Sequence, residues 1–295
     1  MYPVRLLLVG TLLFLWTSSH SQILMDNTIV VQGHRGCRGL LPENTIPAFL
    51  QALELGVSTL EMDVVVTADQ RVIVSHEPWM NPDICVAPDG SKILRAKAKR
   101  LNIYTMTLAE AQSYRLGTKA YSKFPDQQQV ETRKPSLTEV VSEVRAWCLA
   151  NGQDLPGFNI EIKSMAAGDG LFHPGPQEYA QQFLKEFLGL DIELQSTIQS
   201  FDPRLLRAIE NEHSGLNLIY LIDHKRDLPN NFESRFDFKL FGISPDKQLV
   251  NKEVVDFCSE KGYLLSVWTV NDSEEIQALI DLGIRNIISD YPNLL

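Results

Sequence analysis

Three carboxylates are spaced so that they could share one site. Glu61 and Asp63 stand two positions apart in the β-branched run 59–66, so both point to the same face of a strand. Glu161 lies in a second such run, 158–163, which we expect to be the neighbouring strand. Crowded carboxylates repel one another and raise their pKa values unless a cation lies between them. One divalent cation, Ca²⁺ or Mg²⁺, suits this all-oxygen ligand set.

A purely structural interpretation of these carboxylates stays open on spacing alone. Arg35 follows the first predicted strand, and Lys163 ends the strand that carries Glu161. These two cations could form salt bridges with the carboxylates, and no metal would then be held. If a metal is present, the same cations are placed to contact a phosphoryl group bound to it.

Two histidines lie at predicted strand ends, His34 and His76. Only about five residues separate the runs that end at residue 66 and begin at residue 72, which predicts a hairpin. Folding it about residues 68–69 places His76 nearly opposite Glu61. Two histidines beside a metal site suit a general base and a general acid near neutral pH. The alternative is that both are metal ligands or structural residues. The other histidines after residue 21 occur in polar contexts and are predicted to lie on the surface: His173, His213 and His224.

The charge of the chain limits what such a site can bind. Lys and Arg total 27 against 37 Asp and Glu, which gives a formal net charge of −10. Nucleic-acid binding needs a basic footprint, so it is not expected. A small anion can still bind where a metal ion or a few local cations offset the negative charge.

Strands and helices alternate along the chain, and together they must position these side chains. Eight strands of a predicted parallel sheet begin at residues 29, 59, 158, 196, 217, 239, 263 and 285. This alternation predicts an α/β protein, and the number of strands favours a closed (β/α)₈ TIM barrel. Active sites of such barrels lie at the carboxyl ends of the strands, where polar residues recur in this sequence.

The predicted helices between the strands have recognisable ends. Ser136 and Glu139 form a capping box, and Gly152 is placed to end the same helix. Asp202 and Pro203 have the residue types favoured at the start of another helix. Further helices are predicted at residues 44–55, 176–188, 251–261 and 273–282.

Residues 77–133 are predicted to be an insertion after the second strand. This segment has little strand pattern, and one short helix is expected near residues 107–116. Its basic run, residues 92–100, is interpreted as a solvated face. Trp79-Met80 either covers the site or packs beneath the insertion.

The amino-terminal segment predicts export. A short positive end, an apolar run at residues 6–16 and small residues up to Ser21 are typical of a cleaved signal peptide. Residues 1–21 are therefore the expected signal, and residues 22–295 a single domain without stable membrane insertion, periplasmic or extracellular. Export permits a disulfide between the loop residues Cys37 and Cys85, and free thiols are the alternative.

A series of short motifs extends over the chain in a fixed order, from His34 to Pro292. The motifs are His34-Arg35-Gly36, Pro42-Glu43-Asn44-Thr45, Glu61-x-Asp63-Val64, Val74-x-His76, Glu161-Ile162-Lys163, Gln199-Ser200-Phe201, Trp268-Thr269-Val270-Asn271 and Ser289-Asp290-Tyr291-Pro292. Together they resemble the glycerophosphodiester phosphodiesterase family.

This resemblance implies a phospholipase-C-like TIM barrel that hydrolyses glycerophosphodiesters to glycerol 3-phosphate and an alcohol with a divalent metal. The roles it implies are metal ligands for Glu61, Asp63 and Glu161, an acid–base pair for His34 and His76, and phosphate or substrate contacts for Arg35, Lys163, Glu43 and Trp268. The chain departs from the family pattern after His76, where Glu77 replaces the usual Asp and the usual Arg-Thr-Thr-like stretch is missing.

Other functions remain as alternatives. A lysophospholipase D or a phospholipase-C-type enzyme acting on lipids should have an exposed apolar ridge, for which only Trp79-Met80 is a candidate. A non-catalytic exported binding protein should lack some of the carboxylates and histidines, and none is lost here.

Overall fold

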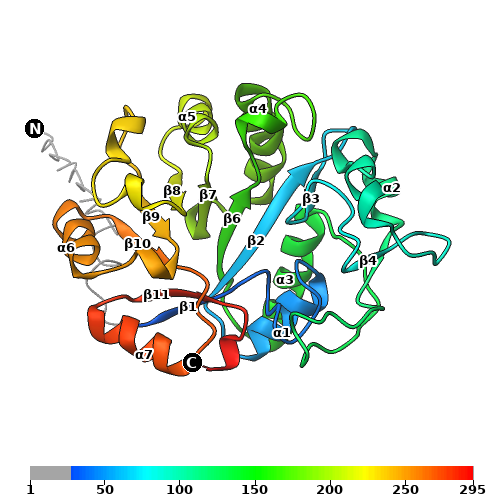
Figure 1. The fold of residues 1–295 in the computed structure, drawn as a ribbon, viewed down its shortest axis with the longest axis horizontal. Helices are drawn as coiled ribbons and strands as arrows, with labels where there is room; N and C mark the ends of the chain where they lie inside the picture. The colour runs from blue at the N-terminus through cyan, green and yellow to red at the C-terminus, as the bar shows by residue number, and fades with distance from the viewer. Residues whose placement is uncertain (1–27, 295) are drawn as a thin grey trace, which may run out of the picture.

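In this computed structural model, which describes residues 28–294, eight parallel strands close into a barrel with helices outside it (Figure 1). The sheet order β1-β11-β10-β9-β8-β7-β6-β2 is closed by pairing of β1 with β2. The predicted (β/α)₈ TIM barrel is therefore confirmed. The strands are β1 Val30–Gly33, β2 Thr59–Val66, β6 Gly157–Ile162, β7 Ser196–Ser200, β8 Asn217–Ile222, β9 Gly242–Pro245, β10 Leu264–Val267 and β11 Asn286–Ser289.

Helices fill most of the connections between these strands, and their ends follow the predicted residue types. Ser136 and Glu139 make both bonds of the capping box at the start of α3, and Gly152 ends that helix with a φ of 63°. Asp202 accepts a hydrogen bond from the Arg204 backbone N–H at the start of α5. The outer helices are α1 Ile46–Glu54, α3 Leu137–Asn151, α4 Pro176–Phe187, α5 Pro203–Glu212, α6 Lys252–Lys261 and α7 Ser273–Leu282. Within residues 28–294, no helix has the length and apolar character needed to span a membrane.

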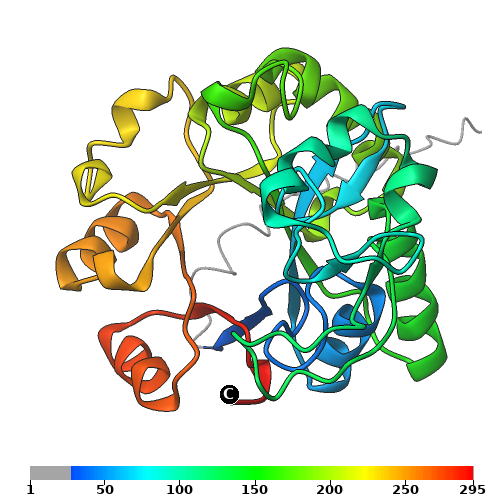
Figure 2. The same cartoon turned by 45° about the vertical axis from the view of Figure 1, so that its right-hand side comes forward.

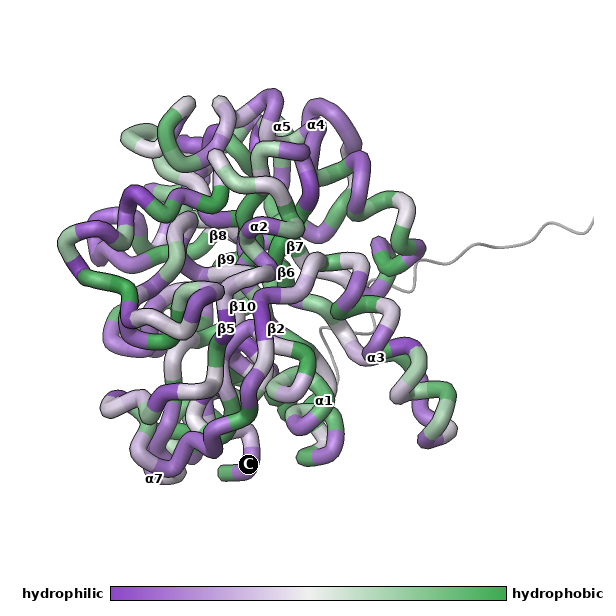
Figure 3. Tube along the Cα trace, turned by 90° about the vertical axis from the view of Figure 1, so that its right-hand side faces the viewer, coloured by the Kyte–Doolittle hydropathy of each residue, from purple (hydrophilic) through white to green (hydrophobic). Residues whose placement is uncertain are grey.

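Alternation along β2 separates the core from the site. Leu60, Met62 and Val64 pack in the main hydrophobic core, so Glu61 and Asp63 between them point to the other face, into the barrel. Hydrophobic and hydrophilic residues are likewise mixed along the outer helices, as on α3 (Figure 3). Their apolar sides supply the rest of this core.

The predicted hairpin after β2 forms with β3, Val72–Val74. Val64 pairs with Val74 and Val66 with Val72, so the hairpin is centred on residue 69. Extending this register places His76 beside Met62, one position from the predicted partner. The regular pairing ends at Val74, and the His76 side chain lines the same cavity as Glu61.

The residues between β3 and α3 build a second, smaller core beside the barrel (Figure 2). Met80 is fully buried in it, and Trp79 packs at its edge, so this pair lies beneath the insertion and forms no exposed ridge. The short elements of this segment are β4 Cys85–Val86, η2 Arg95–Arg100, η3 Ile103–Thr105, α2 Leu108–Gln112 and β5 Arg115–Leu116. The predicted helix 107–116 was too long, because β5 pairs with β4.

The pairing of Cys37 and Cys85 was left open by the sequence. Cys37 lies in the main core and Cys85 in the insertion core, and both are free thiols, so the structure has the alternative without a disulfide. One further expectation about side chains was not met. His173 is buried rather than exposed: its ring stacks on Tyr179, and its Nδ1 lies 2.8 Å from the Pro174 carbonyl oxygen. His213 and His224 are exposed as predicted.

Candidate active site

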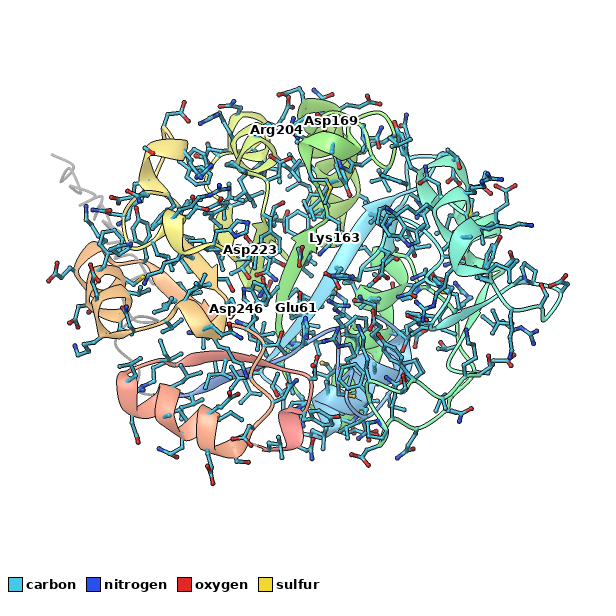
Figure 4. The ribbon with its side chains drawn as sticks, viewed as in Figure 1. Glu61, Lys163, Asp169, Arg204, Asp223 and Asp246 are labelled. Carbon is cyan, nitrogen blue, oxygen red and sulfur yellow. The ribbon has the colours of Figure 1, made fainter. Side chains whose placement is uncertain are left out.

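A cavity of about 290 Å³ opens at the carboxyl ends of the barrel strands. Figure 4 shows Glu61 and Lys163 near the centre of the barrel. Of the predicted site residues, the lining includes His34, Arg35, Glu61, His76, Glu161, Lys163 and Trp268. A larger cavity of about 380 Å³ lies elsewhere, beside Phe232 and Tyr263, and its lining contains no histidine.

Glu61 and Glu161 line this cavity, and Asp63, which is not part of the lining, lies beside them. One oxygen each from Glu61, Asp63 and Glu161 lie within 4.8 Å of one another, and all three side chains are buried. Asp63 pairs directly with Glu161 across β2 and β6, so the predicted neighbouring strands are confirmed. Burial and the other two carboxylates raise the pKa of Glu61 well above its usual range.

These residues fit a hard divalent cation. Oxygen ligands lie about 2.3–2.6 Å from Ca²⁺ and about 2.0–2.1 Å from Mg²⁺, so two ligands of one ion can be up to about 5 Å apart for Ca²⁺ and about 4 Å apart for Mg²⁺. The observed span of 4.8 Å is within the limit for Ca²⁺, and the carboxylates would have to move closer together to bind Mg²⁺. Asp63 Oδ1 is buried without a hydrogen-bond partner. Burying an unpaired polar oxygen costs free energy, and a bound cation would offset that cost.

Two basic side chains partly neutralise the cluster. Arg35 Nε lies 3.1 Å from Asp63 Oδ2, and Lys163 Nζ lies 2.6 Å from Glu161 Oε1 and 3.6 Å from Asp63 Oδ1. Although burial opposes the change, Arg35, His76 and Lys163 hold the pKa of Asp63 well below its usual range. Part of the predicted salt-bridge pattern is therefore present, but Glu61 contacts the Arg35 backbone N–H rather than its guanidinium.

His34 is held by Asp290, a carboxylate that follows the neighbouring strand β11. Its Nδ1 lies 2.6 Å from Asp290 Oδ1, and its Nε2 lies 3.9 Å from Glu61 Oε2. Because a carboxylate only accepts, the proton is on Nδ1, and Nε2 faces the site. Burial lowers the pKa of His34 to about 4, against the opposing effect of Asp290, so the ring is neutral at pH 7.

Asp290 is itself fixed by groups from two other loops. Arg38 donates to both of its oxygens, at 2.9 and 3.0 Å, and Asn271 Nδ2 donates at 2.7 Å. Although burial acts in the other direction, His34 and Arg38 hold the pKa of Asp290 well below its usual range. The carboxylate that orients His34 is therefore ionised and immobile.

His76 has a similar partner, which explains the departure at Glu77. Its Nδ1 lies 3.1 Å from Glu77 Oε1, so its Nε2 is also left for the cavity. Although burial opposes the change, His76 and then Lys134 lower the pKa of Glu77 to about 2. The longer Glu side chain thus supplies the carboxylate contact at this position. His76 is more open than His34, with side-chain exposures of 31% and 11%.

Glu43 lies behind Arg35 rather than in the cavity lining. Arg35 Nη1 donates to Glu43 Oε1 at 2.9 Å, so Glu43 positions the guanidinium. The adjacent Asn44, which the spacing argument did not select, donates to Asp63 Oδ2 at 2.8 Å. Arg35 and Asn44 both have positive φ, 52° and 58°, which the site contacts hold in place.

Trp268 forms part of an aromatic wall of the cavity. Its Nε1 donates to the Ser244 carbonyl oxygen at 2.8 Å, and its ring packs edge-on against Phe201 at 5.7 Å. Lys163 Nζ lies 5.9 Å from the Phe201 ring centroid. The cavity lining therefore combines aromatic side chains with the charged groups, and the two meet at Lys163.

Comparison with known proteins places the chain in a family. The model of the glycerophosphoryl diester phosphodiesterase family matches residues 34–294. The chain belongs to this family. It is therefore a phosphoric diester hydrolase, as the sequence motifs predicted, and every residue of the candidate site lies within the matched range.

Individual members of the glycerophosphoryl diester phosphodiesterase family are only distantly similar to this chain. A glycerophosphodiester phosphodiesterase of Caldanaerobacter subterraneus subsp. tengcongensis is 28% identical over 91% of this chain and 96% of its own length. A solved structure from Silicibacter pomeroyi is 27% identical, with a TM-score of 0.76 over 90% of this chain and 91% of that one. A lysophospholipase D of Rattus norvegicus is 23% identical over 89% of this chain and 83% of its own length.

Proposed function

We propose that the chain hydrolyses glycerophosphodiesters to glycerol 3-phosphate and an alcohol with one divalent cation, Ca²⁺ or Mg²⁺. The observation that carries the proposal is that one cavity is lined by two carboxylates of the cluster, two basic side chains and two histidines with carboxylate partners, with Asp63 beside them. This combination provides a metal site, phosphate contacts and proton transfer in one place.

Glu61, Asp63 and Glu161 would hold the cation. When bound, it supplies Lewis-acid stabilisation of the negative charge on the phosphate oxygens. Arg35 and Lys163 are within reach of the same group and share that charge. The Phe201–Trp268 wall would bound the cavity next to Lys163.

The two histidines would move the protons. His34 is buried and neutral, so it is suited to take a proton from the nucleophile, whereas the more open His76 is suited to protonate the departing alcohol. The nucleophile is either the glycerol hydroxyl of the substrate, which gives a cyclic phosphate, or water. Both routes use the same pair of residues.

Replacing Asp290 with Asn is expected to lower kcat at least tenfold. The amide introduced by Asp290→Asn would offer an N–H to Nδ1 of His34 and favour the tautomer with its proton on the wrong nitrogen, an effect of roughly 10⁴ in a serine-protease triad. Steady-state kinetics should show the loss in kcat with little change in KM. An equal loss in the exposed-surface variant Asp281→Asn would contradict the assignment, because Asp281 lies on α7 away from the cavity.

Lysophospholipase D activity is a second candidate, since a rat relative has that name. The observation that favours it is the exposure of Met165 and Leu171 on the loop after β6, two and eight positions beyond Lys163. A lipid chain could lie on these side chains while its phosphodiester enters the cavity. Both candidate reactions cleave the phosphodiester at the same place, on the alcohol side of the phosphate.

We further propose that residues 1–21 are a cleaved export signal and that residues 22–295 form one periplasmic or extracellular catalytic domain. The small-molecule diester is its expected partner. The net charge of −10 argues against nucleic acid.

Removal of divalent metal should abolish turnover. We expect EDTA to stop glycerol 3-phosphate release, and Ca²⁺ or Mg²⁺ to restore it, because Glu61 and its neighbours bind the ion through oxygen atoms. The assay should compare glycerophosphocholine, glycerophosphoethanolamine and a lysophospholipid. Full activity in EDTA would disprove the metal proposal, and preference for the lysophospholipid would support the second candidate.

A further inference from the structure

The basic run of the insertion presents a defined outer face. The 3₁₀ helix η2, Arg95–Arg100, has three residues per turn, so side chains three positions apart lie in one row. Ala98 is buried in the insertion core, whereas Arg95 in the same row is exposed and pairs with Asp83. Lys97 and Arg100 share a second, exposed row, Lys99 lies in the third, and Leu94 is exposed just before the helix.

The loop between β6 and α4 is linked to this helix through Trp79 and Asn102. Lys99 Nζ is 5.2 Å from the Trp79 ring centroid, and the Trp79 ring is 5.3 Å from that of Phe172. Asn102 Nδ2 donates to the Leu171 carbonyl oxygen at 2.7 Å. Segments about 70 residues apart in the sequence thus form one continuous surface.

Large apolar side chains of this surface are open to solvent. Leu94, Met165 and Leu171 are 59%, 64% and 56% exposed. Met165 follows Lys163, part of the cavity lining, by two positions, so the surface borders the mouth of the cavity. We call it the mouth patch, and its members are Leu94, Lys97, Lys99, Arg100, Met165 and Leu171.

The three cations of the mouth patch have no acidic partner. Across residues 28–294 none of them forms an ion pair, and the acidic residues nearby are taken up by other cations. Arg95 pairs with Asp83, and Arg204 pairs with Asp169 at 2.8 and 3.1 Å, as Figure 4 shows for the second pair. The chain is strongly acidic, so a local excess of unpaired cations beside apolar groups is unusual for it.

We propose that the mouth patch docks this enzyme on an anionic lipid surface, with the cavity facing that surface. Exposed apolar side chains can enter the headgroup region while the cations contact lipid phosphates. A nucleic acid would use the cations but would leave the apolar side chains in water, and the acidic remainder of the chain would repel it. The inference goes beyond the proposed hydrolysis, and binding can be measured without turnover.

The test is sedimentation with sucrose-loaded vesicles in EDTA. The full chain should bind vesicles of phosphatidylcholine that contain about a third phosphatidylglycerol, and should not bind pure phosphatidylcholine. The triple variant Lys97→Gln, Lys99→Gln, Arg100→Gln should bind roughly a hundredfold more weakly, since each basic side chain near the surface contributes about a factor of five. Leu171→Ser should weaken binding roughly tenfold.

Matched controls lie on other faces of the molecule. Leu194 is 91% exposed just before β7, at the opposite end of the barrel, and Lys185 is exposed on α4. Leu194→Ser and Lys185→Gln should leave binding unchanged, and circular dichroism should show that all variants are folded.

The proposal is overturned if the full chain does not distinguish the two vesicles, or if the controls weaken binding as much as the patch variants. It is also overturned if only the cation variant loses binding, because the exposed apolar side chains would then take no part in the docking. Since no outcome depends on hydrolysis, failure here leaves the proposed reaction untouched.

Discussion

Alanine at His34 or at His76 is expected to lower kcat by roughly 10²–10⁴, the usual range for loss of a general acid or base. Both rings line the cavity, and each has its Nδ1 on a carboxylate, so each is positioned to exchange a proton through Nε2. The measurement is kcat for glycerophosphocholine hydrolysis. The exposed residue His213 provides the control, and His213→Ala should behave as the unchanged enzyme.

The two histidine variants should also differ from each other. A substrate with a nitrophenol leaving group needs little protonation as it departs, so loss of the general acid should matter much less. We therefore expect this substrate to restore most of the turnover of His76→Ala and little of that of His34→Ala. Near-normal turnover in either variant with glycerophosphocholine would refute the acid–base pair, and the reverse rescue would exchange the two roles.

Replacing Glu61 with Gln is expected to act in opposite directions on the metal-free and metal-bound protein. Without metal, burial and then repulsion by Asp63 and Glu161 disfavour the charged Glu61 carboxylate and raise its pKa, so its removal should increase the melting temperature. With metal, one ligand is lost, and affinity should fall by more than the roughly 10–100-fold that a lost supporting contact costs.

Thermal unfolding with and without Ca²⁺ or Mg²⁺ tests both halves of this prediction. The unchanged protein should be stabilised by the ion through mass action, and Glu61→Gln should not. Glu274, exposed on α7, is the matched control, and Glu274→Gln should keep the full response. A metal response that survives in Glu61→Gln would contradict the ligand assignment, and a lower metal-free melting temperature would contradict the repulsion argument.

Much of the barrel could be predicted because the signals are local. The run at β2 combines β-branched residues with two carboxylates at period two, so both its bounds and its functional face were predicted correctly. Likewise the capping box at Ser136 set the start of α3. β9 was expected from residue 239 but begins at Gly242, because the apolar residues before it, such as Leu240, pack on the core from a loop.

The groups that support the site were harder to predict, because they converge from separate loops. Arg38, Asn271 and Asp290 follow three different strands, and only closure of the barrel brings them together around His34. The motif Ser289-Asp290-Tyr291-Pro292 marked Asp290 but not its partner. The only indication in the sequence that Arg38 supports the site was its position four residues after His34.

The insertion shows a different limit. Its core draws single residues from several short turns, so neither a period of 2 nor one of 3.6 appears in the sequence. The burial of His173 could not be predicted for the same reason. Its ring is enclosed by a turn of its own loop, in which Asp169 and His173 form an isolated β-bridge. Side chains that are buried by irregular backbone produce no periodic hydrophobic pattern in the sequence.

The most direct test of the proposed chemistry is a ³¹P NMR time course of glycerophosphocholine with the full chain and Ca²⁺ or Mg²⁺. The account predicts that the diester signal is replaced by that of glycerol 3-phosphate, with or without a transient cyclic phosphate, and that EDTA stops the change. Release of phosphocholine instead, or no turnover with either metal, would contradict it.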